Sequence, residues 1–362
     1  MRIAMIGQKG MPARYGGIEK HVEEISTLLA GRGHTVLVYC RPYYTAIEGS
    51  YRGVTLVKLP SVKTRHLDAA SHTIISTAHV LSMKADVVHY HALGPSALSF
   101  IPRLTGARTV ATVHGLDWRG GKWGRGATWL LKRCEYAACH FPTETVVVSG
   151  VLKRYFEEKY GRTVIHVPNG VGPGLKVDPG NVGRFGLTAG DYYLFVGRLG
   201  PEKGCHTLLE AFGRARTGRK LAVVGSAHLN PGYEHELRKL ANDRVVFTGE
   251  IHGEPLSEVW NGAYAVIHPS ITEGMSLSLL EAMAHGRCVV VSDIPENTDV
   301  VQEAAVRFRV GDAADLARVI SEIDCQPDQV RRTGELALAR AAGEFSWERI
   351  VDRLESIYLG RK

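Results

Sequence analysis

The stretch "YYLFVGRLGPEKGCHTLLEAF" (192–212) decides the fold, because its pattern predicts a strand and a helix that are joined by a basic turn. The first six residues, 192–197, are apolar without alternation, as in a strand that is covered on both faces of a parallel sheet. We expect a helix over 204–212. Repeated units of this kind imply a parallel sheet with helices on both sides.

Similar apolar runs recur along the chain in two series. The first comprises 3–7, 35–39, 86–90, 109–114, 145–149 and 163–168, and the second comprises 192–197, 221–225, 245–249, 265–269 and 288–293. Helical patterns lie between them, such as the apolar face formed by Ile18, Val22, Ile25 and Leu29. The stretch between the two series, 167–186, is rich in glycine and proline, which is typical of a linker.

The length and the strand pattern predict an α/β protein of two Rossmann-like, doubly wound domains with parallel sheets. A chain of 362 residues is longer than most domains that have a single hydrophobic core. We expect an N-terminal domain at 1–170 and a C-terminal domain at 171–345. The last segment, 346–362, should form a helix that packs back on the N-terminal domain.

The composition indicates a globular protein but leaves its partner open. Hydrophobic residues make up 44% of the chain and charged residues 22%. The net charge of +7 fits nucleic acid, an anionic membrane or phosphate-bearing small molecules about equally well. The six cysteines form no CxxC pair, and the sequence has neither a signal peptide nor a run of 18 apolar residues. We therefore expect a cytoplasmic protein.

Several phosphate and metal motifs are absent from the sequence. The stretch after the first strand, "GQKGMPARYGGIEKH" (7–21), lacks the G-x-G-x-x-G spacing of dinucleotide-binding proteins, and no P-loop motif occurs. No D-x-D pair is present to hold a metal ion beside a diphosphate. His89 and His91 are better interpreted as two histidines at a strand end than as metal ligands. We therefore expect no metal site and no cofactor.

Two cations and two glycines indicate places for an anion. Arg198 follows the first strand of the second series, and Lys203 stands just before the expected helix. Cations at the carboxyl end of a strand suit a diphosphate, although a surface ion pair with Glu202 would also explain them. Gly16 and Gly17 directly precede another helix, where the backbone can approach a ligand closely; an ordinary glycine-rich turn is the alternative.

The stretch "PSITEGMSLSLLEAMAHG" (269–286) places Glu273 and Glu281 eight residues apart. Eight helical residues span about 12 Å, comparable to the distance from a sugar across a diphosphate to a ribose. Glu273 could accept hydrogen bonds from sugar hydroxyls and Glu281 from ribose hydroxyls, with the helix-start amides of 274–277 facing the phosphates. Alone, the pair also fits simple helix capping; with the two upstream cations, it indicates a nucleotide-sugar site.

Over most of its length the chain resembles glycosyltransferase family 4, the retaining transferases of GT-B fold. The resemblance is carried by "YGGIEKHVEEIS" (15–26), "RGHTV" (32–36), "VPNGV" (167–171), "VGRLGPEKG" (196–204) and "EGMSLSLLEAMAHG" (273–286). The variant "GMPARYGGIE" (10–19) is similar to members that build bacterial surface polysaccharides. The resemblance implies an acceptor-side N-terminal domain and a nucleotide-sugar-binding C-terminal domain that face an interdomain cleft.

Carried over by position, the resemblance implies metal-independent transfer of a sugar with retention of configuration, UDP being slightly favoured as the nucleotide. Arg198 and Lys203 would stabilise the leaving diphosphate, and Glu273 would hold the sugar. His114 matches the family's histidine beside the sugar, with a core histidine as the alternative. The implied donor-binding residues are Gly16, Gly17, Glu250, Ile251, Gly274, Met275, Ser276, Leu277 and Glu281. The family's Gly-Phe-Gly is Gly-Met-Ser here, so we expect a donor pocket of different shape.

The segment "DWRGGKWGRGATWLLKR" (117–133) interleaves tryptophans with basic residues. This pattern suits an anionic lipid interface, where a glycan or lipid-linked acceptor would be found. The protein would then be peripheral on the inner face of the plasma membrane. The alternative is a solvated basic helix whose tryptophans pack within the N-terminal domain.

Three other functions compete with sugar transfer. A nucleotide-sugar 2-epimerase has the same fold and is the main alternative, but the sequence does not point to the additional acid and base carboxylates that it needs. A nicotinamide dehydrogenase lacks its glycine fingerprint. A nucleic-acid-binding role rests on net charge alone, so we expect no nucleic acid partner.

Overall fold

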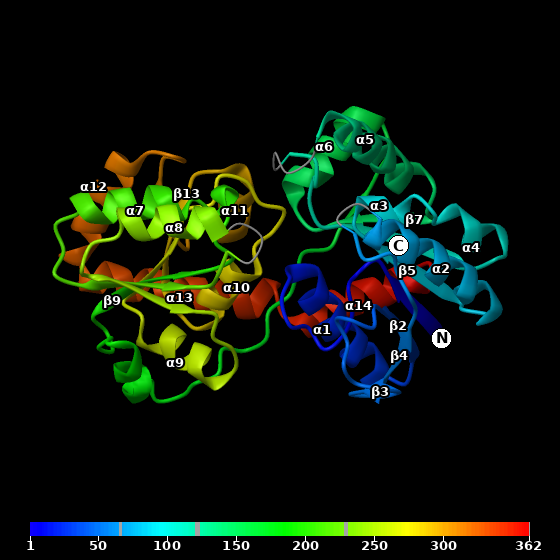
Figure 1. Ribbon diagram of the computed structural model, residues 1–362, viewed down its shortest axis with the longest axis horizontal. Coiled ribbons are helices and arrows are strands. Elements are labelled where there is room, and N and C mark those ends of the chain that lie inside the picture. Colours follow the sequence, from blue (N-terminus) through cyan, green and yellow to red (C-terminus); the bar gives the residue numbers. More distant parts are fainter. Residues whose placement is uncertain (65–66, 120–123, 228–230, 362) are drawn as a thin grey trace. The chain divides into compact units, whose positions relative to one another are not determined.

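The computed structural model divides the chain into two compact units, each described by itself. It describes residues 1–64, 67–119, 124–227 and 231–361. The N-terminal unit comprises Met1–Gly170 and Trp347–Lys362, and the C-terminal unit comprises Val171–Ser346. In Figure 1 the N-terminal unit runs from blue to green and returns in red, and the C-terminal unit runs from green to orange.

The N-terminal unit is built on an eight-stranded sheet. Its strands are β1 (Arg2–Ile6), β2 (Thr35–Cys40), β3 (Ser50–Tyr51), β4 (Val54–Lys58), β5 (Val87–His91), β6 (Arg108–Val113), β7 (Glu144–Val147) and β8 (Ile165–His166). They lie in the order β3-β4-β2-β1-β5-β6-β7-β8, and all neighbours are parallel except β3 and β4. The direction of winding therefore reverses between β1 and β5. Open parallel sheets bind ligands at such a reversal, beyond the carboxyl ends of the strands.

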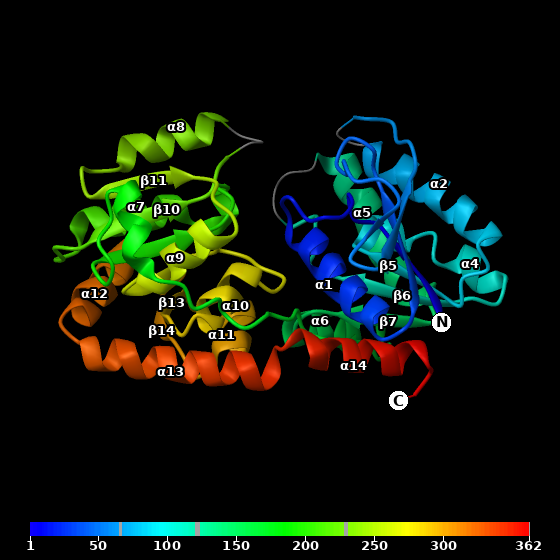
Figure 2. The same cartoon turned by 90° about the horizontal axis from the view of Figure 1, so that it is seen from below.

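Helices from both ends of the chain pack in this unit. They are α1 (Gly17–Gly31), α2 (Asp68–Ser82), α3 (Leu93–Ser96), α4 (Phe100–Leu104), α5 (Arg125–His140), α6 (Gly150–Tyr160) and α14 (Trp347–Tyr358). Three residues of the expected apolar face of α1, Val22, Ile25 and Leu29, are fully buried. Helix α14 packs beside α1 (Figure 2), and its Glu355 Oε1 lies 2.7 Å from His34 Nε2.

The C-terminal unit contains a six-stranded, wholly parallel sheet. Its strands are β9 (Tyr192–Val196), β10 (Lys220–Val224), β11 (Val245–Gly249), β12 (Ala265–His268), β13 (Cys288–Ser292) and β14 (Val306–Phe308). The order β11-β10-β9-β12-β13-β14 reverses between β9 and β12. Both units thus wind outward from their first strand in two directions.

The helices of the C-terminal unit alternate with these strands. They are η1 (Pro179–Phe185), η2 (Pro201–Lys203), α7 (Cys205–Arg214), α8 (Pro231–Leu240), α9 (Glu254–Gly262), α10 (Leu277–Ala284), α11 (Pro295–Val301), α12 (Ala313–Asp324) and α13 (Pro327–Glu344). In the core, Tyr193 and Phe195 of β9 pack in one cluster with Leu208 and Phe212 of α7. Burying a side chain of this size stabilises the fold by roughly 1.5–3 kcal/mol.

The predicted α/β class with doubly wound parallel sheets is confirmed, whereas the list of strands needs correction. It omits β3, β4 and β14, because β3 has only two residues, β4 begins with alternating buried and exposed residues, and β14 has only three residues. The run 163–168 is a strand only at Ile165–His166. None of the helices within the described residues is long and apolar enough to cross a membrane.

Candidate functional site

Three of the predicted catalytic residues lie at the carboxyl ends of β9 and β12, where the winding of the C-terminal sheet reverses. Arg198 follows β9, Lys203 ends η2, and Glu273 lies in the loop after β12. Lys203 and Glu273 are 70 residues apart in the sequence, and their side chains nevertheless meet. Parallel winding brings them together because every strand of the sheet ends at the same edge.

Glu273 is a buried carboxylate that three side chains hold in place. Its Oε1 lies 2.5 Å from Lys203 Nζ and 3.3 Å from His268 Nε2, and it accepts a hydrogen bond from Ser270 Oγ at 2.7 Å. Burial would raise the pKa of Glu273, but the Lys203 ammonium and then His268 lower this pKa well below the usual carboxyl value. The carboxylate is therefore ionised at neutral pH and can accept hydrogen bonds.

Arg198 forms the second ion pair at this edge, with Glu202 of η2. Its side chain is 50% exposed, and the pair is correspondingly weak. The carbonyl oxygen of Glu202 accepts a hydrogen bond from the backbone N–H of Ile271 at 2.9 Å, which ties the η2 turn to the loop that carries Glu273. Each of the two predicted cations thus has a carboxylate partner within the protein.

The backbone at this edge is packed so closely that two positions require glycine. Gly204 has a φ of +67°, and a Cβ there would lie 2.0 Å from the carbonyl oxygen of Pro269. Gly225 has a φ of +135°, and its Cβ would lie 1.9 Å from the carbonyl oxygen of Gly197. A side chain at either position would force neighbouring backbone segments apart. Gly204 lets the end of the η2 turn pack against Pro269 after β12, and Gly225 lets the end of β10 pack against Gly197 after β9.

The segment from Glu273 to Glu281 is not the continuous helix that was expected from the sequence. Helix α10 begins at Leu277, so Glu273 lies outside it, and only the stretch from Leu277 to Glu281 is helical. This stretch rises about 6 Å, half of the expected span. Gly274 and Met275 form the turn before the helix, where Met275 is buried. The straight-helix argument for the spacing of the two carboxylates is therefore wrong.

The other predicted donor-binding residues of this unit lie at the start of α10 and after β11. Ser276 is the N-cap residue of α10, and within the described residues its side chain does not cap the helix; its Oγ lies 3.1 Å from Ser278 Oγ. The first amides of a helix have no acceptor within the helix, so they can face an anion. Glu250 and Ile251 follow β11 at the same edge of the sheet, and Ser226 Oγ donates a hydrogen bond to Glu250 Oε1 at 2.8 Å.

The paired glycines lie at the start of α1 in the N-terminal unit. Gly16 precedes the helix with a φ of +101°, and Gly17 is the first helical residue. A Cβ at Gly16 would lie 2.0 Å from Glu19 Oε2, while Glu19 Oε1 accepts a hydrogen bond from the backbone N–H of Lys9 at 3.1 Å. The loop before α1 is thereby folded against the first turn of the helix.

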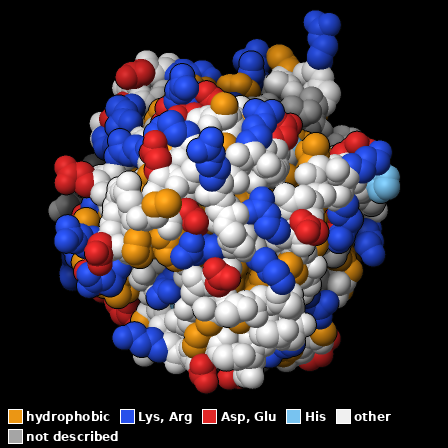
Figure 3. Space-filling view, turned by 90° about the vertical axis from the view of Figure 1, so that its left-hand side faces the viewer, with side chains coloured by type: hydrophobic (Ala, Val, Ile, Leu, Met, Phe, Trp, Pro, Cys, Tyr) orange, Lys and Arg blue, Asp and Glu red, His pale blue; other side chains and the backbone are white. Residues whose placement is uncertain are grey.

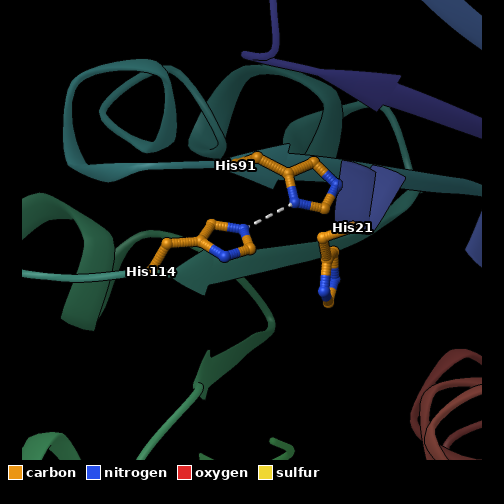
Figure 4. Close-up of side chains that lie close together, drawn as sticks. All are labelled: His21, His91 and His114. Atoms are coloured by element: carbon orange, nitrogen blue, oxygen red, sulfur yellow. Dashed lines mark hydrogen bonds between the residues drawn. The ribbon is translucent and has the colours of Figure 1, made fainter. Parts of the chain in front are cut away.

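His114 directly follows β6 and belongs to a cluster of three imidazoles, shown in Figure 4. His91 ends β5, and its Nδ1 is hydrogen bonded to His114 Nε2 at 3.2 Å. His21, from α1, packs edge-on against the His114 ring with a centroid distance of 4.8 Å. One nitrogen from each ring lies within 4.8 Å of the others, so the cluster has the donor set for a metal ion such as Zn²⁺.

Burial keeps these imidazoles uncharged. It lowers the pKa of His21 to about 4, and burial together with the neighbouring histidines lowers the pKa values of His91 and His114 well below the usual range. The adjacent His89 has both ring nitrogens engaged, with Tyr358 Oη and Thr112 Oγ1, each at 2.7 Å. The histidine edge of the N-terminal unit therefore offers hydrogen bonds rather than positive charge.

Four residues at these two edges were not among the predicted site residues: His21, His91, His268 and Ser270. Of these, His91 was interpreted only as a histidine at a strand end. Alternation along β5 puts His89 and His91 on one face of the strand, and His91 is in register with Thr112, two residues before His114. A strand that ends in His-x-His beside another that ends in His was the available signal for His91. His268 and Ser270 flank Pro269 in the loop after β12, and nothing in their spacing pointed to Glu273.

The basic segment 117–133 has an inward-facing and an outward-facing tryptophan. Trp118 faces inward, since its Nε1 donates a hydrogen bond at 2.6 Å to the fully buried carboxylate of Glu135. The same carboxylate accepts hydrogen bonds from Tyr155, Lys159 and Tyr160. Trp129 of α5 is instead 60% exposed, with the Arg133 guanidinium over its ring. Lys122 and Trp123 lie outside the described residues.

Two family models match the chain. The model for Glycosyltransferase Family 4 matches residues 15–174, and the model for Glycosyl transferases group 1 matches residues 190–323. Among curated proteins, the glycogen synthase of Mycobacterium tuberculosis is 25% identical over 406 residues, a match that covers 100% of this chain and 95% of the relative. The family resemblance inferred from the motifs is therefore confirmed.

Solved structures show the same fold. Sucrose-phosphate synthase from Thermosynechococcus elongatus superimposes with a TM-score of 0.86 at 21% identity, covering 99% of this chain and 98% of that one. HepE of Anabaena, solved with UDP and glucose, gives a TM-score of 0.81 at 17% identity, covering 99% and 100%. The fold is therefore GT-B, and the comparisons do not support the epimerase alternative. This chain belongs to glycosyltransferase family 4.

Proposed function

We propose that this glycosyltransferase moves a sugar from a nucleoside diphosphate sugar to a glycan or lipid-linked acceptor in the synthesis of a cell-surface polysaccharide. UDP is the favoured nucleotide, a choice supported by the similarly folded HepE, which was solved with UDP and glucose. The observation that carries the proposal is the Lys203–Glu273 pair at the reversal of the C-terminal sheet, with Arg198 at the same edge.

We propose that the cations at this edge change their hydrogen-bond partners when the donor binds. Lys203 and Arg198 turn from their carboxylates to the oxygens of the diphosphate, which is a stronger acceptor of charged hydrogen bonds. The Glu273 carboxylate, still held by Ser270 at 2.7 Å, then accepts hydrogen bonds from the sugar hydroxyls. Glu281 takes the ribose hydroxyls, and the first amides of α10 take phosphate oxygens.

Transfer is proposed to proceed without a metal and with retention of configuration. The bond between the anomeric carbon and the β-phosphate oxygen breaks, and the acceptor oxygen bonds to that carbon on the same face. The leaving phosphate takes the proton of the acceptor hydroxyl. Negative charge grows on the diphosphate as it leaves, and Lys203, Arg198 and the helix-start amides stabilise it. By its resemblance to the family's histidine, His114 lies beside the sugar.

Release of nucleoside diphosphate from a panel of nucleotide sugars, with EDTA present, tests the proposed reaction. We expect release that requires an acceptor and continues in EDTA. Loss of activity in EDTA with recovery on adding Mg²⁺ or Mn²⁺ would contradict the metal-independent mechanism. A free sugar isomer formed without acceptor would instead indicate an epimerase. Determining the anomeric configuration of the product by NMR tests retention.

A surface on α5 supports a second part of the proposal, peripheral attachment to the inner face of the plasma membrane. Trp129, Leu130 and Tyr136 have exposed fractions of 60%, 56% and 50%, and Lys132 and Arg133 lie among them. Apolar side chains mixed with cations suit the boundary of an anionic bilayer. The cysteines are all unpaired thiols, which fits the reducing cytoplasm.

Binding to vesicles tests the membrane proposal. We expect the protein to sediment with vesicles that contain phosphatidylserine at low salt, and less with phosphatidylcholine alone. Trp129→Ala combined with Arg133→Glu should abolish this binding. The matched control is Arg331→Glu on α13, which removes an exposed arginine elsewhere. Equal sedimentation of both variants would contradict a role for α5.

The part of the surface that Figure 3 shows does not favour a nucleic acid partner. On the face shown in Figure 3, basic and acidic side chains are interspersed, and the basic ones do not gather into a stripe. A nucleic acid backbone usually requires a continuous basic patch.

A further inference from the structure

The contact between His91 and His114 bears on which nitrogen of His114 carries a proton. His91 is fully buried, and its Nδ1 lies 3.2 Å from His114 Nε2. A neutral imidazole has one N–H donor and one bare nitrogen that accepts. One ring must therefore donate to the other, and the choice determines which nitrogen of His114 is left to face a ligand.

The second nitrogen of His91 decides between the two arrangements. His91 Nε2 is buried and has no hydrogen-bond partner among the residues that the structure describes. If His91 Nδ1 accepted, the proton of His91 would be on Nε2, where a buried N–H would have no acceptor. If His91 Nδ1 donates, Nε2 is only an unpaired acceptor. Buried orphan N–H groups are rarer and more costly in proteins than under-satisfied acceptors.

The surroundings of His91 favour the same arrangement. His89, whose ring centroid is 4.2 Å from that of His91, already uses both of its nitrogens on Tyr358 and Thr112. His89 is therefore not available to accept a hydrogen bond from His91 Nε2. His21 approaches His91 edge to face, with a centroid distance of 5.7 Å. Figure 4 shows the two bonded rings at the ends of neighbouring strands, with the hydrogen bond between them.

We propose that His91 is a positioning residue that donates its Nδ1 hydrogen to His114 Nε2, so that His114 carries its proton on Nδ1. His114 then meets the substrate as a hydrogen-bond donor and not as a base. The identity of that substrate rests on the proposed function, whereas the protonation of the two rings does not. A donating His114 cannot take the acceptor's proton through Nδ1, which leaves that role to the departing phosphate.

The protonation state can be measured directly by NMR on histidine labelled with ¹⁵N in the ring. Comparison with His114→Gln identifies the signals of His114. We expect the Nδ1-protonated tautomer for His114 in the wild-type protein and a mixture of tautomers in His91→Leu. An Nε2-protonated His114 would overturn the proposal. One equivalent of Zn²⁺ that persists through dialysis and disappears in His91→Leu would also overturn it, because the cluster would then be a metal centre.

Paired variants test the consequence for activity. An Asn amide lies near the position of imidazole Nδ1, and a Gln amide lies near Nε2, so His114→Asn should retain more activity than His114→Gln. His91→Leu should lower kcat by about 10²-fold, the order of effect of losing one aligned donor. His91→Asn keeps a donor near Nδ1 and should recover most of that loss. Equal losses in His91→Asn and His91→Leu would contradict the positioning role.

Two controls separate the possible failures. UDP affinity of the His91 variants should match that of the wild type, because His91 lies in the N-terminal unit and the diphosphate edge in the C-terminal unit. Thermal unfolding of His91→Leu and His91→Asn shows whether both variants are folded at the temperature of the assay. Absence of nucleotide release from wild-type protein with every donor would refute the proposed function. The NMR result would still decide the protonation of His114 in that case.

Discussion

The carboxyl edges of the two sheets have the same topology and opposite chemistry. In each unit the winding reverses beside the first strand, and polar side chains collect where the neighbouring strands end. In the C-terminal unit these side chains are ionised, with Lys203 beside Glu273 and Arg198 beside Glu202. In the N-terminal unit they are neutral imidazoles, among them His91 and His114.

This difference shows how one fold can serve two tasks. Paired charges can be exchanged for a charged ligand, because the ligand replaces one ionic partner of each cation with another. Buried neutral imidazoles make directional hydrogen bonds without adding charge beside a leaving anion. We therefore assign binding of the diphosphate to the C-terminal edge and orientation of an uncharged group to the N-terminal edge.

The largest expected effect is on turnover at the charged edge. Lys203→Ala should lower kcat by about 10²–10³-fold, because the ammonium is proposed to stabilise charge that develops on the leaving diphosphate. Initial rates of nucleotide release measure this effect. The matched control is Lys220→Ala, which removes a lysine from the opposite end of the same sheet. Similar rates for the two variants would remove Lys203 from the reaction.

A smaller effect is expected for the second cation. Arg198→Ala should weaken UDP binding by about 10-fold, as for the loss of a hydrogen bond to a charged group. Its thermal unfolding should hardly change, because half-exposed ion pairs contribute only about 0–1 kcal/mol to stability. Calorimetric titration and thermal melts check the two parts. A large fall in melting temperature with unchanged UDP affinity would indicate a structural role instead.

Acidification should change the stability of the two units to different extents. His21 has a folded pKa of about 4 against an unfolded value of 6.5, so between these pH values only the unfolded chain binds the proton. The free energy of unfolding should thus fall by about 1.4 kcal/mol per pH unit for each such histidine below pH 6.5. The lowered pKa of Glu273 gives stability that is present above 4.5 and lost as the pH falls below it.

Hydrogen exchange at pH 7 and pH 5, corrected for intrinsic rates, measures this difference. Protection should decrease in the strands β5 and β6 at pH 5 and should persist in β9 and β12. Loss of protection in all four strands together would contradict the separate electrostatics of the two edges.

The smallest expected effect concerns Glu281. Glu281→Gln keeps the size of the side chain and one acceptor but removes the charge, so we expect KM for the donor to rise by a few-fold with kcat nearly unchanged. The matched control is Glu335→Gln, which makes the same change on α13. A fall in kcat without a change in KM would place Glu281 in the reaction itself.

The sequence predicted the strands better than the contacts between side chains. Continuous apolar runs such as 192–197 and 288–293 coincide with the buried strands β9 and β13, so the fold class followed from them. The spacing of Glu273 and Glu281 led to a wrong expectation of one continuous helix, because the helix begins only at Leu277. The roles of His91 and His268 depend on which strand ends are neighbours, and a linear pattern does not contain that information.

Calorimetric titration of UDP into the protein in EDTA tests the central claim most directly. We predict that UDP binds without a metal, that Lys203→Ala abolishes measurable binding, and that Lys220→Ala leaves it unchanged. Equal UDP affinity in the wild type and in Lys203→Ala would contradict the claim that the paired charges of the C-terminal edge form the diphosphate site.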